Sequence, residues 1–299
     1  MIPGATDAGV TVIAPAKINL YLHVLGRRAD GYHLLDSLAA FAGIQDVVAA
    51  RPADDLTLTI AGEHAGDAPV DDTNLVLRAA RLLAETAGVA PGAALTLTKR
   101  LPVASGMGGG SADAAATLKA LDRLWGLGTA PADLMRLGLM LGADVPVCLG
   151  GRAAFMGGIG ADLAPAPALP PASVLLVNPG VAVQTPAVFR ARTGPFSQPG
   201  RFDYAPADAG ELAALLQART NDLTEAAIAL QPVIETVLTA LEACPGVLLA
   251  RMTGSGATCF GLFADAGDAA AAALALGPAN PGWWVKAASL ESDAARLDR

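Results

Sequence analysis

The chain has 299 residues, of which 53% are hydrophobic, and a formal net charge of −8. This length predicts two domains, and the apolar content is ample for a hydrophobic core. The acidic charge, without any block of Lys and Arg residues, argues against a nucleic-acid partner. An anionic substrate would have to be attracted by local groups, because the field of the whole chain repels it.

The three cysteines, Cys148, Cys244 and Cys259, are widely spaced in apolar contexts. This pattern favours buried thiols in a reducing compartment over disulfides or a zinc site. The segment Met1–Val10 has neither a basic region nor an apolar run, so no signal peptide is expected. The longest alanine-rich run, 269–276, is too short to span a bilayer. We therefore expect a cytoplasmic protein without a membrane partner.

The first half of the chain is predicted to mix strands and helices. Strand-like patterns occupy residues 10–25, 56–60 and 94–99. Apolar residues recur with helical spacing at 74–88, ended by Gly88, and at 131–141, ended by Gly142. Between these two helices, Ser111 is the expected N-cap of a helix with apolar residues at 115, 118, 121 and 125.

The second half is separated from the first by a change in composition at residues 164–171, APAPALPP. This segment predicts a boundary between an N-terminal domain, 1–163, and a C-terminal domain, 172–299. Beyond the boundary we expect a strand at 174–177, a loop at 191–210, and helices at 211–219 and 223–243. The tail is predicted as a strand, a Gly-Ser-Gly turn, a strand, an alanine-rich helix and a final strand at 283–290. Small alternating units with a hairpin favour an α+β fold over a doubly wound sheet.

Residues 14–25 are predicted to form a strand with two chemically different faces. Strict alternation places on one face Ala16, Ile18, Leu20, Leu22 and Val24. The opposite face then carries Lys17, Asn19, Tyr21 and His23. Such a strand is either an ordinary half-exposed strand or one that brings an ammonium, an amide, a phenol and an imidazole to a site.

A glycine-rich loop at 101–113, LPVASGMGGGSAD, precedes the helix that Ser111 is expected to cap. Glycines let backbone N–H groups approach an anion closely, and a helix start adds free donors and the positive end of the dipole. The loop therefore predicts phosphate binding, although a glycine-rich turn without a ligand remains the simpler alternative. It is neither a P-loop, since no Gly-Lys-Ser/Thr follows, nor a Gly-x-Gly-x-x-Gly fingerprint.

Two shorter segments complete the candidate features. Asp144 follows a helix end among apolar residues and precedes a strand expected to be bent by Pro146. It is either a partly desolvated carboxylate that acts as a base or ion-pair partner, or a turn residue bonded to its own backbone. The segment 252–258, MTGSGAT, is a second glycine loop between two apolar strands, and a hairpin turn is its simplest interpretation.

In this order the segments resemble the GHMP kinases, a superfamily of small-molecule kinases. The matching segments are 15–20 (PAKINL), 28–33 (RADGYH), 101–102 (LP), the glycine loop, 141–146 (LGADVP), 179–181 (PGV), 185–189 (TPAVF), 221–223 (NDL) and 253–256 (TGSG). The resemblance covers roughly residues 12–265. Within the superfamily it is strongest to the branch that acts on a cytidyl-linked methylerythritol.

The resemblance implies a two-domain α+β architecture with the active site in the cleft between the domains. It implies transfer of the γ-phosphate of ATP, with Mg²⁺, to the 2-hydroxyl of the cytidine-diphosphate-linked polyol, in the non-mevalonate isoprenoid pathway. The family's catalytic pair falls on Lys17 and Asp144. Its ATP loop falls on Pro102, Val103, Ala104, Ser105, Gly106, Met107, Gly108, Gly109, Gly110, Ser111 and Ala112. Its cytidine pocket falls on Asn19, Tyr32, His33, Thr185 and Phe189.

Elementary chemistry is compatible with these roles. An alcohol is a poor nucleophile until a base such as Asp144 takes its proton, and Lys17 would stabilise the developing charge. Tyr32 and Phe189 are suited to sandwich a pyrimidine ring while His33 reads its edge. Without the resemblance, Tyr32 and His33 would be interpreted as a surface hairpin pair and Phe189 as a core aromatic residue.

Several points stay open at this level. Asp113 either caps its helix, which we favour, or turns away or meets the nucleotide through Mg²⁺. Asn74 either caps a helix or faces the adenine, and Ala112 stands where many relatives have a second serine. Lys17 has two candidate partners, Asp144 and phosphate. The competing functions are another GHMP kinase, of the homoserine or mevalonate type, and a nucleotide-binding relative without catalysis.

Overall fold

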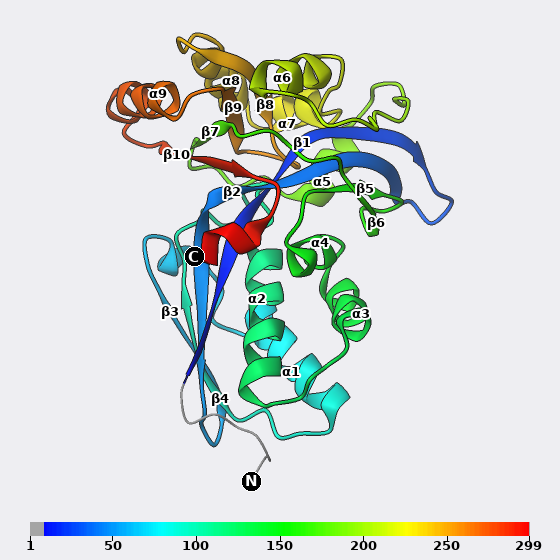
Figure 1. Cartoon of the computed structure of the whole chain (residues 1–299), viewed down its shortest axis with the longest axis vertical. Coiled ribbons are helices and arrows are strands. Elements are labelled where there is room, and N and C mark those ends of the chain that lie inside the picture. The colour runs from blue at the N-terminus through cyan, green and yellow to red at the C-terminus, as the bar shows by residue number, and fades with distance from the viewer. Residues whose placement is uncertain (1–8, 299) are drawn as a thin grey trace.

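The structure, a computed structural model, describes residues 9–298 (Figure 1). Most of the segment Met1–Val10, for which no signal peptide is expected, lies outside the described residues. Among the described helices, none has the length and apolar character needed to cross a membrane.

The strands alternate with helices along the whole chain (Figure 1). The strands are β1 (Val10–Arg27), β2 (His33–Arg51), β3 (Leu56–Ala61), β4 (Ala93–Thr98), β5 (Ala154–Gly157), β6 (Asp162–Pro165), β7 (Ser173–Asn178), β8 (Val247–Met252), β9 (Cys259–Phe263) and β10 (Trp284–Glu291). The helices are α1 (Leu75–Ala87), α2 (Gly109–Leu124), α3 (Pro131–Leu141), α4 (Val145–Gly150), α5 (Thr185–Ala191), α6 (Ala209–Gln217), α7 (Thr224–Leu230), α8 (Val233–Glu242) and α9 (Ala266–Ala279). Two 3₁₀ turns, Ala65–Asp67 and Ala294–Asp298, complete the list.

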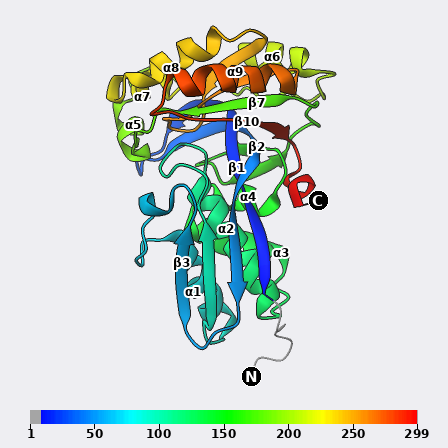
Figure 2. The same ribbon diagram turned by 90° about the vertical axis from the view of Figure 1, so that its left-hand side faces the viewer.

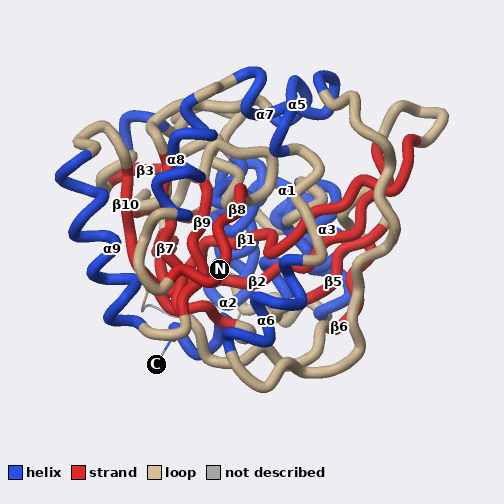
Figure 3. Tube along the Cα trace, turned by 90° about the horizontal axis from the view of Figure 1, so that it is seen from above, coloured by secondary structure: helices blue, strands red, loops and turns tan. Residues whose placement is uncertain are grey.

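The strands join into one sheet of mixed direction in the order β3-β4-β2-β10-β7-β9-β8, with β1 and β5 also paired to β2. Helices α1 to α4 pack beside β1 to β4, and helices α6 to α9 cover β7 to β10 at the opposite end (Figures 1 and 2). Seen from above, α9 runs alongside β10 and β7 at one side of that end (Figure 3). These are the helices and strands of an α+β fold, as the sequence predicts.

The long antiparallel pair of β1 and β2 runs through both ends of the molecule (Figure 1). Its central residues are buried on both faces, since the neighbouring sheet, the helices and the loops pack on either side. The interpretation of residues 14–25 as a half-exposed strand is therefore wrong. The sequence analysis did not predict β2 at all.

The expected alternation along β1 is also interrupted. The pairing with β2 shifts between Asn19 and Tyr21, so one extra residue lies on β1 at this point. Such a bulge reverses which face the following side chains occupy. Lys17 and Asn19 therefore line a large cavity, whereas the Tyr21 hydroxyl donates to Asp36 at 2.9 Å on another face.

His23 is separated from the cavity together with Tyr21. Its Nε2 accepts a hydrogen bond from the Thr220 amide at 3.1 Å, and its Nδ1 lies 2.8 Å from the Gln198 carbonyl oxygen. The four polar side chains predicted to share one face thus divide into two pairs with different surroundings.

Three further local predictions need correction. Helix α2 begins at Gly109 with Gly108 as its N-cap, so Ser111 lies inside the first turn and caps nothing. The strand expected after Asp144 is the short helix α4, which Pro146 starts because proline favours a first helical turn. The helix expected at 223–243 is two helices, α7 and α8, separated at Gln231 and Pro232.

Helix α1 was predicted correctly, including the residues at which it begins and ends. The Asn74 side chain accepts a hydrogen bond from the Val76 amide at 2.8 Å, and Gly88 ends the helix with a left-handed φ of 67°. The helix at 131–141 and the strands at 174–177 and 283–290 also form as expected. The boundary at 164–171 between domains 1–163 and 172–299 stays a prediction.

Candidate active site

A cavity of about 640 Å³ opens where the glycine loop, β1 and the beginnings of α1, α4 and α5 meet. Its wall includes nine residues of the loop: Pro102, Val103, Ala104, Ser105, Gly106, Gly108, Gly109, Gly110 and Ser111. Met107 and Ala112 are buried in the hydrophobic core instead, so their side chains face away from the cavity. Backbone N–H groups and small side chains therefore form most of this wall.

The loop is shaped by two glycines with left-handed backbone. Gly106 has a φ of 79°, and Gly108, with a φ of 62°, directly precedes α2. A Cβ on Gly108 would lie 3.0 Å from Cε of Lys17 and 3.8 Å from Oδ2 of Asp144. The loop backbone thus passes directly over the predicted catalytic pair, where any larger residue would push the two side chains apart.

Lys17 and Asp144 form an ion pair, with Nζ of Lys17 2.9 Å from Oδ2 of Asp144. The Lys17 side chain is 3% exposed, whereas 36% of the Asp144 side chain is exposed. The lysine is therefore held beneath the carboxylate, and the carboxylate is the member of the pair that faces open space. The Lys17 amide also donates to the Met107 carbonyl oxygen at 3.0 Å, which joins β1 to the loop.

Asn19 positions Lys17 from two residues further along β1. Its Oδ1 accepts from Nζ of Lys17 at 2.9 Å, and its Nδ2 donates to Oγ of Ser37 at 2.7 Å. The Ser37 hydroxyl in turn donates to the Tyr21 carbonyl oxygen at 2.6 Å, at the bulge. This buried chain of hydrogen bonds fixes the orientation of the Asn19 side-chain amide and hence the position of the Lys17 ammonium group. Asn19 was expected in a cytidine pocket, but in this structure it contacts Lys17.

The second glycine loop supports the first from behind. The Thr253 hydroxyl accepts a hydrogen bond from the backbone N–H of Asn19 at 2.8 Å. The Ser105 carbonyl oxygen accepts one from the backbone N–H of Thr258 at 3.1 Å. Asn221 holds the second loop, since its Nδ2 donates to the Met252 and Gly254 carbonyl oxygens, each at 2.8 Å. The segment 252–258 is therefore more than a hairpin turn.

Arg251, directly before this loop, is buried and donates to three carbonyl oxygens. These belong to Leu20, Leu216 and Arg219, at 2.7 to 2.9 Å. Because the Leu20 carbonyl sits at the bulge of β1, the guanidinium satisfies an acceptor that the strand ladder leaves open.

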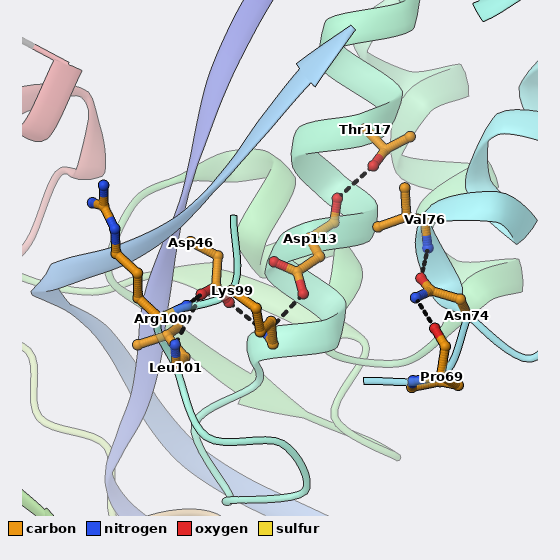
Figure 4. A network of polar contacts seen from close by, with 9 residues as sticks. All are labelled: Asp46, Pro69, Asn74, Val76, Lys99, Arg100, Leu101, Asp113 and Thr117. Carbon is orange, nitrogen blue, oxygen red and sulfur yellow. Dashed lines mark hydrogen bonds and ion pairs between the residues drawn. The ribbon is translucent and has the colours of Figure 1, made fainter. Parts of the chain in front are cut away.

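A buried ionic cluster joins β2, α2 and the residue that follows β4 (Figure 4). Lys99, just past β4, bridges Asp46 of β2 and Asp113 of α2, with 2.8 Å between Nζ and Oδ2 of Asp113. Asp46 also accepts from the amides of Arg100 and Leu101 at 2.5 and 2.9 Å. The cluster therefore ties the start of the loop to the helix at its end.

The favoured role of Asp113 as a helix cap is wrong, because the residue lies inside α2 and pairs with Lys99. Burial raises the pKa of Asp113 to about 7, an effect that Lys99 opposes and Asp46 reinforces. The sequence analysis missed Lys99 and Asp46 as site residues. No local signal marked them, because Asp46 follows the polar Gln45 on a strand that the sequence analysis did not predict, and only the fold brings it to Lys99.

Asn74 serves the role of helix cap, and it also lines the cavity (Figure 4). Its amide Nδ2 donates to the Pro69 carbonyl oxygen at 2.6 Å. Both ends of the side chain are thus occupied by the chain's own backbone.

A second cavity, of about 790 Å³, adjoins the first. The two share a wall that consists of Leu35, Ile159, Thr185, Pro186 and Phe189. Tyr32 and His33 line only the second cavity, together with the cationic side chains of Arg27, Arg190 and Arg192. Four of the five residues predicted for a cytidine pocket therefore lie around this cavity, and Asn19 does not.

The aromatic residues of the second cavity are arranged differently from the predicted sandwich. The rings of His33 and Phe189 stack on each other, with centroids 5.0 Å apart and planes 25° apart. Tyr32 is 62% exposed. Burial, Arg27 and Arg192 lower the pKa of His33, so the imidazole is neutral at pH 7 and carries one donor and one acceptor.

The comparisons with known proteins agree with this geometry. The family models for the GHMP kinase N-terminal domain and C-terminal domain match residues 74–152 and 205–280. A 4-diphosphocytidyl-2-C-methyl-D-erythritol kinase of Paramagnetospirillum magneticum is 56% identical over 94% of this chain and 99% of its own. The same-named enzyme of Rhodospirillum rubrum is 55% identical, over 95% and 93%.

Among solved structures, the crystal structure of a 4-(cytidine 5'-diphospho)-2C-methyl-D-erythritol kinase superposes with a TM-score of 0.75. It shares 36% identity over 94% of this chain and 99% of the other. The chain therefore belongs to the GHMP kinases and, within them, to the family of 4-diphosphocytidyl-2-C-methyl-D-erythritol kinases. It is a small-molecule kinase.

The contact between the two glycine loops yields a testable prediction. A Cβ on Gly106 would lie 2.5 Å from the Thr253 carbonyl oxygen and 2.8 Å from that of Gly256. The matched control is Gly128, which has a similar φ of 61° but open space around it. We expect Gly128→Ala to cost about 1–2 kcal/mol from backbone strain alone. Gly106→Ala should cost about 1–3 kcal/mol more, because backbone atoms must move apart.

Urea denaturation of both variants measures the free energies of unfolding. Equal destabilisation by the two substitutions would show that the loops do not pack as tightly as described.

Proposed function

We propose that this kinase transfers the γ-phosphoryl group of ATP to the 2-hydroxyl of 4-diphosphocytidyl-2-C-methyl-D-erythritol, a step of the non-mevalonate isoprenoid pathway. The names of relatives at about 55% identity support this reaction. The observation that carries the mechanism is the Lys17–Asp144 ion pair directly under the glycine loop.

Asp144 acts as the general base. The acceptor hydroxyl gives its proton to the exposed carboxylate as its oxygen forms a bond to the γ-phosphorus. The bond from that phosphorus to the bridging oxygen of the β-phosphate breaks, and ADP leaves with the electron pair. The partial exposure of Asp144 makes its carboxylate accessible to the acceptor, whereas the buried Lys17 cannot reach far from its present position.

Lys17 stabilises the charge of the reacting groups. Its ammonium is held by Asp144 and Asn19 at 2.9 Å each, so its position is set before the substrates arrive. A preorganised cation is worth more than a mobile one, because no reorganisation is needed in the transition state. Phosphoryl transfer depends mainly on positioning and charge neutralisation, which a glycine loop, one lysine and one aspartate supply.

ATP binds with its phosphates at the glycine loop, where the start of α2 offers free N–H groups and the positive end of the helix dipole. Mg²⁺ would reduce the repulsion between the phosphates and the acceptor oxygen. Within residues 9–298, no three His, Cys, Asp or Glu side chains gather as a metal site. The ion would therefore be held mainly by the phosphates, with the Ser105 hydroxyl as an oxygen donor on the cavity wall.

The second cavity suits the cytidine diphosphate part of the acceptor. The exposed ring of Tyr32 and the Phe189 ring offer faces for the pyrimidine, and the neutral His33 offers one donor and one acceptor to its edge. Arg27 and Arg190 supply positive charge for a diphosphate in a chain that is acidic overall. A small alcohol such as homoserine or mevalonate has no group that would need this cavity.

The first experiment measures ADP release with Mg-ATP and, in parallel, the cytidyl-linked methylerythritol, homoserine, mevalonate and isopentenyl phosphate. We expect turnover only with the cytidyl compound. Turnover only with another alcohol would overturn the assignment of the second cavity. Binding of ATP without turnover of any acceptor would favour a relative that has lost catalysis.

The role of Asp144 is tested by Asp144→Asn, which keeps the size of the side chain and removes its basicity. We expect kcat to fall about 10²–10⁴-fold, the usual contribution of a positioned base. The dissociation constant of ATP should change little. The control is Asp133→Asn, an exposed carboxylate on α3 paired only with Arg136. Near-normal turnover of Asp144→Asn would rule out the general base.

The acceptor pocket is tested by Tyr32→Ala and Phe189→Ala. Loss of base stacking is worth about 1–3 kcal/mol, so KM for the cytidyl substrate should rise about 5- to 150-fold while KM for ATP stays nearly constant. The larger effect is expected for Phe189→Ala, which also removes the stacking partner of His33. Tyr204→Ala, an exposed tyrosine that lines neither cavity, is the control. Equal effects on both substrates would contradict the assignment.

A further inference from the structure

The buried cluster of Asp46, Lys99 and Asp113 contains more acidic than basic side chains (Figure 4). Two carboxylates share one ammonium, and each side chain is at most 4% exposed. If both carboxyl groups were ionised, the cluster would carry one uncompensated negative charge on side chains that are almost completely buried. Burying such a charge is costly, and a carboxyl group avoids that cost by binding a proton.

Asp113 is the acidic residue of the cluster that has an oxygen without a hydrogen-bond partner. Its Oδ2 pairs with Lys99, but its Oδ1 is buried without a hydrogen-bond partner (Figure 4). Both oxygens of Asp46 are occupied, by Lys99 and by the amides of Arg100 and Leu101. A proton is therefore accommodated best on Asp113, where an O–H at Oδ1 displaces no existing bond.

Asp113 belongs to the cavity in which phosphates are expected. Asp113 and Lys99 both line the first cavity. Asp113 follows Gly109 by four residues on α2, so the two share one face of the helix. A Cβ on Gly109 would lie 3.1 Å from Nζ of Lys99. The phosphates of a nucleotide at the loop would therefore be close neighbours of this cluster.

The electrostatic surroundings favour the protonated form. The charged and titratable groups that face Asp113 are Lys99 beyond β4, Asp46 from β2 and Cys148 from α4. Burial raises the pKa of Cys148 to about 12, so this thiol stays neutral. Burial together with Asp46 outweighs Lys99 and raises the pKa of Asp113 to about 7. An arriving polyphosphate adds further negative charge, which raises the affinity of Asp113 for a proton again.

We propose that Asp113 is a proton-linked nucleotide-binding residue. When ATP binds at the glycine loop, the carboxyl group of Asp113 takes up one proton from solvent, and its O–H at Oδ1 donates a hydrogen bond into the cavity. The proposal rests on the proposed function only in that ATP is the ligand of this loop. A metal ion at Oδ1 is disfavoured, since the Lys99 ammonium is 2.8 Å from the other oxygen of the same carboxylate.

The test is calorimetric titration of the full chain with ATP, without acceptor and without Mg²⁺, at pH 7.5 and 8.5. This pH range lies above the pKa of a terminal phosphate, which is about 6, so proton binding by ATP itself contributes little. Two buffers with different ionisation enthalpies give the number of protons taken up. We expect up to one proton per ATP, and a dissociation constant that rises up to about tenfold over this pH unit, the limit for a single linked proton.

Asp113→Asn separates charge from shape. The amide is neutral at every pH and carries N–H donors, so we expect no proton uptake and a dissociation constant independent of pH. At pH 8.5 this variant should bind ATP more tightly than the unaltered chain. Asp113→Ala lacks the donor and should bind more weakly than Asp113→Asn at both pH values. The control is Asp133→Asn, which removes an exposed carboxylate and should retain the proton uptake.

The outcomes are distinct. Tight ATP binding by the unaltered chain without proton uptake would overturn the inference and leave the proposed function intact. Proton uptake that persists in Asp113→Asn would assign the proton to another group, which also overturns it. Failure to bind ATP at either pH would overturn the inference together with the proposed function. If Asp113→Asn does not fold, Asp113→Ala, which also lacks the carboxyl group, provides the same comparison of proton uptake.

Discussion

The site depends on the close contact between the backbones of two glycine loops that lie about 150 residues apart in the chain. A Cβ on Gly106 would collide with the backbone of Thr253 and Gly256, and a Cβ on Gly254 would collide with the backbone of Gly106. Because the second loop is held by Asn221, and the bulge of β1 by Arg251, the C-terminal helices and strands determine where the first loop lies. Contact between backbones without intervening side chains makes this position rigid, since no rotamer change can absorb a displacement.

The rigid loop separates two ionic systems that have different tasks. On one side Gly108 covers the pair of Lys17 and Asp144, in which one charge balances the other. On the other side Gly109 covers the cluster of Lys99, where negative charge is in excess. Both systems lie against neighbouring residues of the loop, Gly108 and Gly109. In the proposed function, the neutral loop, the balanced ion pair and a cluster that binds a proton would together let an acidic chain bind a polyanion at one place.

Much of the fold could be predicted from the sequence, at the places where interactions between neighbouring residues determine the structure. Helix α1 has a cap at Asn74 and a stop at Gly88, and short-range hydrogen bonds alone specify both ends. The predictions failed where distant contacts decide. The bulge in β1 depends on Arg251, and the partners of Asp113 come from β2 and from the end of β4, so neither follows from spacing along one strand or helix. Lys17 and Asp144 were predicted as a catalytic pair from the family resemblance, and the structure shows the contact between them that the sequence analysis left open.

The wall shared by the two cavities has a thermodynamic consequence. Helix α5 contributes Thr185 and Phe189 to both cavities, and the Thr185 hydroxyl lies 2.7 Å from that of Ser255 in the second glycine loop. The two cavities are thus linked through one short helix, which is hydrogen-bonded to the second glycine loop. If binding of one ligand increases the affinity for the second, binding of the second increases the affinity for the first by the same free energy. Under the proposed function, coupling between the two substrates would involve α5 together with Leu35 and Ile159 of the shared wall.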